Sequence, residues 1–211
     1  MVVFPTSMGS FFEWEDQKMP EALSEHLERG WLQLYCVDSV DKESWYAKKK
    51  PMGDRAWRQE LYNQYIRNEV IPFSEHRNPT PYLIMAGASF GAYHALNFAL
   101  RYPDLVNRVI GMSGMYNIKE LTRGYSDDNV YSNDPSHYAL NFNDHVHLEA
   151  LRRMDIILAI GRDDPHYQDN IHISNALWQK NVWHAFRVWD GWSHDWPWWR
   201  EMIKLYAGGA D

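Results

Sequence analysis

The chain has 211 residues, a formal net charge of −7 at neutral pH and a hydrophobic share of 45%. Its length allows a sizeable buried core, so we expect one domain over residues 1–211. The acidic balance excludes nucleic acid as the main partner, and no apolar run approaches the ~20 residues that a membrane-spanning helix needs.

The predicted elements alternate between short apolar runs and longer amphipathic stretches. Strands are expected at residues 2–5, 31–37, 82–88, 106–113, 156–161 and 184–189. Helices are expected at residues 18–29, 54–77, 90–101, 145–153, 166–180 and 196–206. Most strand candidates are apolar nearly throughout, which is typical of strands buried on both faces. The pattern predicts an α/β fold with a mostly parallel sheet of about six or more strands, helices on both faces and no large cap domain.

Residues 114–144 interrupt this alternation. They are long and polar, and we expect at most one short helix among them. Such a stretch is typical of a lid or rim beside a functional site. A plain surface excursion is an equally good interpretation.

The stretch LIMAGASFGAYHAL, residues 83–96, places Ser89 between a strand and a helix, with Gly87 and Gly91 on its flanks. A serine at the apex of such a tight turn has a strained backbone, and a Cβ on either flank would strike the neighbouring strand or helix. In this context Gly-x-Ser-x-Gly is a nucleophile elbow, which exposes the hydroxyl above the sheet. We therefore predict that Ser89 is a nucleophile. The alternative is a helix N-cap serine beside two packing glycines.

A serine nucleophile needs a base to take its proton and an acid to orient that base, and on this fold both follow the serine in the chain. Asp163 and Asp164 lie in the turn after the strand at 156–161. We predict Asp164 as the acid, because it begins the turn into the next helix just ahead of Pro165. Asp163 is the alternative, and a capping role for both is another.

The predicted base is His194, one of ten histidines. It lies in the loop after the last strand, beyond the carboxyl end of that strand, where α/β sheets place their chemistry. The alternative is a histidine stacked within the aromatic segment GWSHDWPWW. His26, His76 and His94 fall in helical patterns and are interpreted as structural.

Two backbone N–H groups are expected to stabilise the oxyanion that forms when the nucleophile attacks. The first predicted donor is Phe90, the residue after Ser89. The second comes from the loop after the strand at 2–5, where Ser7 or Met8 would donate. Spacing does not decide between these two.

Aromatic residues cluster around the predicted base and the predicted oxyanion loop. Phe11, Trp192 and Trp196 are candidates for contact with a sugar or a hydrophobic acyl group. The alternative is that these aromatic side chains pack the last helix onto the sheet.

Neither a cofactor nor a metal is predicted. The chain has no GxGxxG or GxxxxGK[ST] pattern, and His145 and His147 near Asp144 lack further ligands at suitable spacing. The single cysteine, Cys36, excludes an internal disulfide, and the start of the chain does not resemble a signal peptide. We expect a cytoplasmic protein.

Four segments together resemble a known family: VVFPTS, GASFGAYHALNFALRYPD, GRDDP and GWSHDWPWW. They are similar to the α/β-hydrolase esterases that include esterase D, feruloyl esterases and polyhydroxybutyrate depolymerase-like proteins. The resemblance implies Ser89 as nucleophile, Asp164 as acid and His194 as base. It also implies Ser7 and Phe90 as oxyanion donors.

The sequence thus predicts a serine carboxylic-ester hydrolase that acts through a Ser–His–Asp triad and an acyl-enzyme on small acyl or sugar esters. The expected partner is a small-molecule ester, with neither nucleic acid nor a membrane, and a homo-oligomer stays open. The alternatives are an acyltransferase with the same triad, a secreted polymer esterase, and a non-catalytic binding protein on a hydrolase fold.

Overall fold

A computed structural model describes residues 1–208 of the chain. At its centre is a six-stranded sheet with the strand order β2-β1-β3-β4-β5-β6, and every neighbouring pair is parallel. The strands are β1 (Val2–Phe4), β2 (Tyr35–Cys36), β3 (Ile84–Ala88), β4 (Arg108–Met112), β5 (Asp155–Gly161) and β6 (Ala185–Trp189). The predicted fold class is confirmed, and no large cap domain is inserted within the described residues.

Helices occupy the connections between the strands. Before β3 they are α1 (Glu13–Asp16), α2 (Met19–Ala22), α3 (Ser24–Glu28), α4 (Met52–Tyr65), the π-helical turn η1 (Ile66–Val70) and α5 (Ile71–Arg77). After β3 they are α6 (Phe90–Arg101), α7 (Lys119–Thr122), α8 (Asp128–Ser132), α9 (Pro135–Tyr138), the 3₁₀ turn η2 (Ala139–Asn141), α10 (His145–Arg153), α11 (Tyr167–Gln179) and α12 (Trp196–Ala207). None of the helices in the described part of the chain has the length and hydropathy to cross a bilayer.

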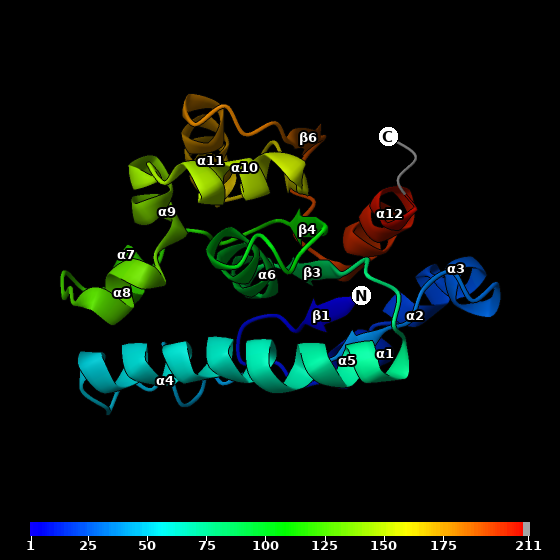
Figure 1. Cartoon of the computed structure of the whole chain (residues 1–211), viewed down its shortest axis with the longest axis horizontal. Coiled ribbons are helices and arrows are strands. Elements are labelled where there is room, and N and C mark those ends of the chain that lie inside the picture. Colours follow the sequence, from blue (N-terminus) through cyan, green and yellow to red (C-terminus); the bar gives the residue numbers. More distant parts are fainter. Residues whose placement is uncertain (209–211) are drawn as a thin grey trace.

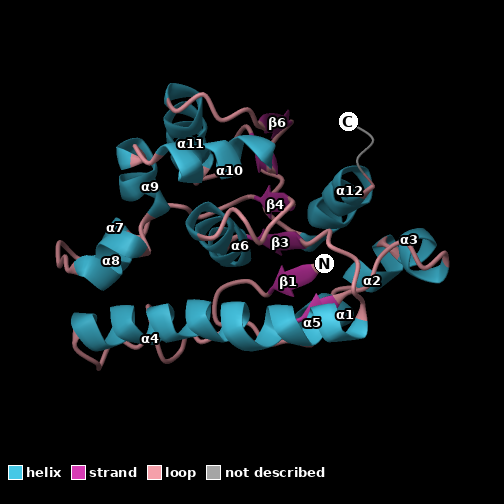
Figure 2. Ribbon diagram, viewed as in Figure 1, coloured by secondary structure: helices cyan, strands magenta, loops and turns pink. Residues whose placement is uncertain are grey.

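The helices cover both faces of the sheet. Figure 1 shows α6 on one side of the strands and α12, α2 and α3 on the other, and Figure 2 shows the same layers by element type. Each face has its own buried cluster, and the neighbouring residues Ile156 and Ile157 of β5 belong to opposite clusters. Because successive strand residues point to opposite faces, nearly continuous apolar runs were needed to fill both.

Strand β2 is shorter than the strand predicted at 31–37. Only Tyr35 and Cys36 pair with β1, opposite Val2 and Val3. Trp31 is 62% exposed, and its N–H donates to the carbonyl of a residue in α3 instead of to a neighbouring strand. The prediction was wrong for residues 31–34, because an apolar pattern does not by itself provide a partner strand.

Residues 114–144 contain more helix than predicted, namely α7, α8, α9 and η2. Each of these helices has only three to five residues, too few to give a visible periodicity. Two signals were nevertheless present in the sequence. Asp127 caps α8 by accepting the N–H of Val130 at 2.7 Å, and Pro135 occupies the first position of α9.

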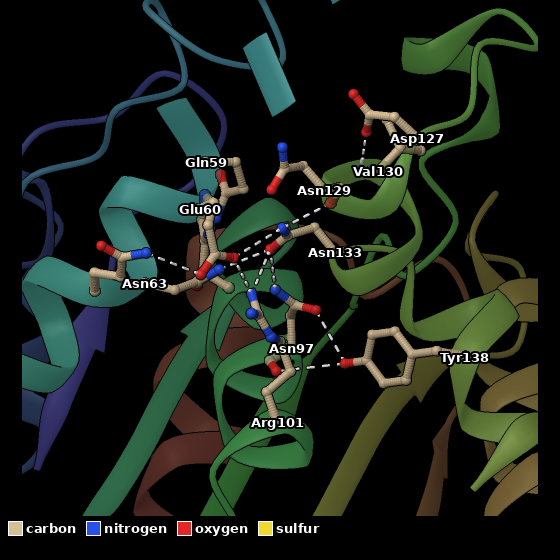
Figure 3. Close-up of polar contacts among 12 residues, drawn as sticks. Gln59, Glu60, Asn63, Asn97, Arg101, Asp127, Asn129, Val130, Asn133 and Tyr138 are labelled. Atoms are coloured by element: carbon tan, nitrogen blue, oxygen red, sulfur yellow. Dashed lines mark hydrogen bonds and ion pairs between the residues drawn. The ribbon is translucent and has the colours of Figure 1, made fainter. Parts of the chain in front are cut away.

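Asn133, between α8 and α9, fixes this segment to the helices beneath it (Figure 3). Its Oδ1 accepts hydrogen bonds from Asn63 at 2.7 Å, Asn97 at 2.9 Å and Arg101 at 3.1 Å, which lie in α4 and α6. Its Nδ2 donates to the carbonyl of Asn129 at 2.9 Å. Asn133 is fully buried, so these bonds replace those that water would make.

Truncation of Asn133 to alanine would leave several buried donors without an acceptor. We expect Asn133→Ala to lower the free energy of unfolding by about 2–4 kcal/mol, measured by urea denaturation. Asn129→Ala is the matched control, because Asn129 contributes only its main-chain carbonyl to this contact, and its effect should stay within about 0.5 kcal/mol. Equal losses in the two variants would contradict the anchoring role of Asn133.

Candidate active site

The chain turns sharply from β3 into α6 at Ser89. This residue has φ 55° and ψ −119°, a conformation that is strained for any residue with a side chain. A Cβ on Gly87 would lie 2.2 Å from the carbonyl carbon of Gly91, and a Cβ on Gly91 would lie 2.5 Å from the carbonyl oxygen of Phe4. Both flanking positions therefore require glycine, because the helix and β1 approach the turn so closely.

Three side chains from the carboxyl ends of β3, β5 and β6 meet above the sheet. Nε2 of His194 lies 3.2 Å from Oγ of Ser89, and Nδ1 of His194 lies 2.8 Å from Oδ2 of Asp164. These are hydrogen-bond distances, the first of them long, as is common before substrate binds. The structure thus brings together Ser89, His194 and Asp164, the residues predicted as nucleophile, base and acid.

Asp164 and Asp163 have different environments. Asp164 is buried, and its second oxygen accepts the N–H of His166 at 2.8 Å, whereas Asp163 is exposed. Burial alone would raise the pKa of Asp164, but the hydrogen bonds from His194 and His166 outweigh burial and lower the pKa below its usual value. Asp164 is therefore ionised at neutral pH and can hold the Nδ1–H of His194.

The loop that carries His194 is held from beneath. Oγ of Ser113, at the end of β4, donates to the carbonyl of Ser193 at 3.2 Å and accepts the indole N–H of Trp199 at 3.0 Å. The rings of Trp199 and Trp192 lie 5.3 Å and 5.7 Å from the imidazole of His194, between ring centroids. These contacts fix the orientation of the imidazole relative to Ser89.

The two oxyanion donors predicted from the sequence lie at the carboxyl ends of β1 and β3. In the described part of the chain, neither the N–H of Ser7 nor that of Phe90 has a hydrogen-bond partner. The N–H of Met8, by contrast, donates to Oδ2 of Asp41 at 2.8 Å. Since the N–H of Met8 is already occupied and that of Ser7 is free to donate, the geometry favours Ser7 over Met8 as the second donor.

The predicted substrate-contacting aromatics differ in exposure. Phe11 is 54% exposed and Trp192 is 53% exposed, so both rings are available to a ligand. Trp196 is half-buried and packs edge-on against Trp199 at 5.0 Å between centroids, as part of the cluster under α12. A substrate contact for Trp196 stays a prediction.

Two residues that the sequence did not mark contact the turn that carries Ser7 and Met8. Asp41 accepts the Met8 N–H, and the hydroxyl of Tyr46 lies 3.0 Å from Oγ of Ser7. Both follow β2 in a stretch without a recognisable motif, so no signal in the sequence marked them.

Within residues 1–208, no group of three or more His, Cys, Asp or Glu side chains is placed to share a metal ion. His147, which follows the polar stretch 114–144, instead donates from Nε2 to the carbonyl of Leu100 at 2.8 Å.

A parallel sheet with a strained serine between β3 and α6, and a histidine and a carboxylate after later strands, defines an enzyme of the α/β-hydrolase class. The sequence matches the family described as "Putative esterase" over residues 35–205, and the chain belongs to this family. The expectation of a carboxylesterase is thereby confirmed. No curated protein matches the sequence.

Solved structures share the fold at low sequence identity. A ferulic acid esterase superposes with a TM-score of 0.73 and 19% identity, covering 97% of this chain and 81% of that chain. An S-formylglutathione hydrolase from Staphylococcus aureus superposes with a TM-score of 0.62 and 19% identity, covering 96% of this chain and 77% of that chain. The fluorophosphonate-binding serine hydrolase F of Staphylococcus aureus superposes with a TM-score of 0.63 and 21% identity, covering 96% of this chain and 79% of that chain. At these identities the similarity establishes the fold.

Proposed function

We propose that this carboxylesterase works through a triad of Ser89, His194 and Asp164 and an acyl-enzyme intermediate. The observation that carries the proposal is the continuous chain of contacts from Ser89 Oγ to His194 Nε2, at 3.2 Å, and from His194 Nδ1 to Asp164, at 2.8 Å. A serine hydroxyl becomes nucleophilic when a neighbouring imidazole takes its proton.

In the first half of the reaction, Oγ of Ser89 attacks the ester carbonyl carbon while its proton passes to Nε2 of His194. His194 then gives that proton to the departing alkoxide, and the alcohol leaves. In the second half a water molecule attacks the acyl carbon, His194 accepts a proton from it, and the proton returns to Ser89 as the carboxylic acid is released. The ionised Asp164 stabilises the imidazolium in both halves.

The oxyanion of each tetrahedral intermediate is bound by the N–H groups of Ser7 and Phe90. Their lack of partners within the described residues supports this role. The arrangement is preorganised, since both donors belong to backbone segments that hydrogen bonds hold in place, and each donor is worth roughly 10²–10³ in kcat.

The substrates we propose are small acyl or sugar esters. The exposed rings of Phe11 and Trp192 support this choice, because flat apolar surfaces can stack on a sugar or an acyl group, and the ring of Trp192 lies 5.7 Å from the imidazole of His194 between centroids. The similarity to a ferulic acid esterase adds ferulic acid esters to the candidates.

An ester panel with an added alcohol tests the proposal. We expect the protein to hydrolyse p-nitrophenyl acetate faster than longer acyl esters, to release free acid in the presence of glycerol, and to be labelled by a fluorophosphonate probe, which reacts only with an activated serine. Formation of glyceryl ester in place of free acid would identify an acyltransferase. Absence of both turnover and labelling would identify a non-catalytic binding protein and overturn the proposal.

We also propose a cytoplasmic location. The single cysteine, Cys36, is a free thiol, which is typical of a reducing compartment. Burial, together with the nearby carboxylate of Glu15, raises the pKa of Cys36 to about 11, so the thiol is unreactive at neutral pH.

A further inference from the structure

The turn at residues 6–9, which carries Ser7, is held by carboxylates on both sides of that residue. The N–H of Thr6 donates to Glu13 at 2.7 Å, and the N–H of Met8 donates to Oδ2 of Asp41 at 2.8 Å. Hydrogen bonds to an ionised acceptor are roughly twice as strong as neutral ones. They occupy the donors that flank Ser7 and leave the Ser7 N–H free.

The conformation of Met8 requires a restraint from other residues, because its backbone is strained. Its φ is 58°, a region that residues with a Cβ rarely adopt. Strain of this kind persists only where the surroundings fix the conformation. The bond from the Met8 N–H to Asp41 is a direct restraint at this residue.

Asp41 also reaches the helix that follows the nucleophile. Its Oδ1 accepts a hydrogen bond from Nε2 of His94 in α6 at 2.8 Å, and both side chains are almost fully buried. A buried carboxylate is costly unless it is paired and hydrogen-bonded. Here one oxygen binds the turn and the other binds α6, so Asp41 bridges the two.

His94 lies one helical turn after Phe90, and their rings are 5.0 Å apart in an edge-to-face contact. Residues four apart lie on the same face of a helix. The Asp41–His94 pair therefore joins the segment that carries one proposed oxyanion donor, Ser7, to the segment that begins with the other, Phe90.

We propose that Asp41, oriented by His94, is a positioning residue that sets the distance and angle between the Ser7 and Phe90 N–H groups. This inference rests on the proposed function of the Ser89 site. Asp41 acts through the backbone of Met8 and contacts no substrate. Its removal lets the turn relax from the positive φ of Met8 and misaligns one donor.

The test compares Asp41→Ala with Asp41→Asn, in which the amide oxygen can still accept the Met8 N–H. For p-nitrophenyl acetate we expect Asp41→Ala to lower kcat about 10–100-fold, somewhat less than complete loss of a donor. KM should change less than about twofold, as expected when an interaction belongs to the transition state. Asp41→Asn should recover most of kcat. The affinity for a phenylboronic acid, whose tetrahedral adduct places an oxygen in the same hole, should follow kcat.

Glu43→Ala is the matched control, because Glu43 is in the same loop but its carboxylate pairs with Arg58 at 2.9 Å, outside the turn. It should retain the wild-type kcat. If Asp41→Ala does not fold, His94→Leu and His94→Gln provide the same comparison, since glutamine can still donate to Asp41. All rates are expressed per mole of folded protein, taken from the amplitude of the cooperative unfolding transition, so a loss of folded protein does not count as a loss of kcat.

The outcomes separate the two proposals. If Ser89→Ala is inactive but the alanine and leucine variants keep the wild-type kcat and boronate affinity, the positioning role is wrong and the proposed function stands. If Ser89→Ala keeps the wild-type rate, the proposed function itself fails. A loss of kcat in Asp41→Ala with recovery in Asp41→Asn supports the positioning role.

Discussion

Replacement of Ser89 by alanine is expected to lower kcat/KM for p-nitrophenyl acetate by about 10⁵–10⁶-fold, because the group that forms the acyl-enzyme is absent. A small residual rate above that of buffer is expected, since the proposed oxyanion donors remain. The substitution should leave the melting temperature unchanged or raise it, because the hydroxyl of Ser89 contacts only His194 among the described side chains. The measurement is the initial rate together with thermal unfolding of both proteins.

The matched control is Ser24→Ala, which alters an exposed serine in α3, on the side of the sheet opposite α6. It should leave the rate and the melting temperature unchanged. Fluorophosphonate labelling should be lost in Ser89→Ala and kept in Ser24→Ala. A folded Ser89→Ala protein with more than about 1% of the wild-type rate would exclude Ser89 as the nucleophile, since triad removal costs far more.

The four central strands of the sheet could be predicted from sequence because they are buried on both faces. β5 is an example: the run at 156–161 has no polar residue to break it, and the observed strand begins one position earlier at Asp155. The edge strand β2 was predicted too long, because its length depends on β1, its neighbour in the described sheet, and not on its own pattern. The anchoring role of Asn133 could not be read from sequence either, since its partners come from α4 and α6.

In the candidate site, too, some residues could be predicted from the sequence and others could not. The elbow around Ser89 was predictable because its chemistry is local: the strand, turn, glycines and helix are consecutive. Asp164 and His194 could be proposed because parallel strands bring their carboxyl ends to one edge. The choice between Ser7 and Met8 depended on Asp41, a buried carboxylate from a different loop, which no pattern indicates. Contacts of this kind are specified by packing and are visible only in three dimensions.

Replacement of Asp164 by asparagine is expected to lower kcat about 10⁴-fold for p-nitrophenyl acetate. An amide cannot carry the negative charge that stabilises the imidazolium, and its NH₂ group facing Nδ1 favours the wrong tautomer of His194. The hydrogen bond from the His166 N–H to the retained oxygen should keep the turn in place. KM should change little, because the carboxylate contacts the base and not the ester.

Asp163→Asn is a control of unusual closeness, since it makes the same chemical change at the adjacent residue. Asp163 is exposed, whereas Asp164 is buried and its Oδ2 lies 2.8 Å from Nδ1 of His194. Only the substitution of Asp164 therefore removes a negative charge that contacts the imidazole. Asp163→Asn should retain the rate within about twofold, as surface substitutions away from such contacts have small effects. Comparable losses at both positions would mean that the two carboxylates act on His194 through the field of the whole turn. A loss confined to Asp163→Asn would assign the acid to the other residue and require the turn to rearrange in the working enzyme.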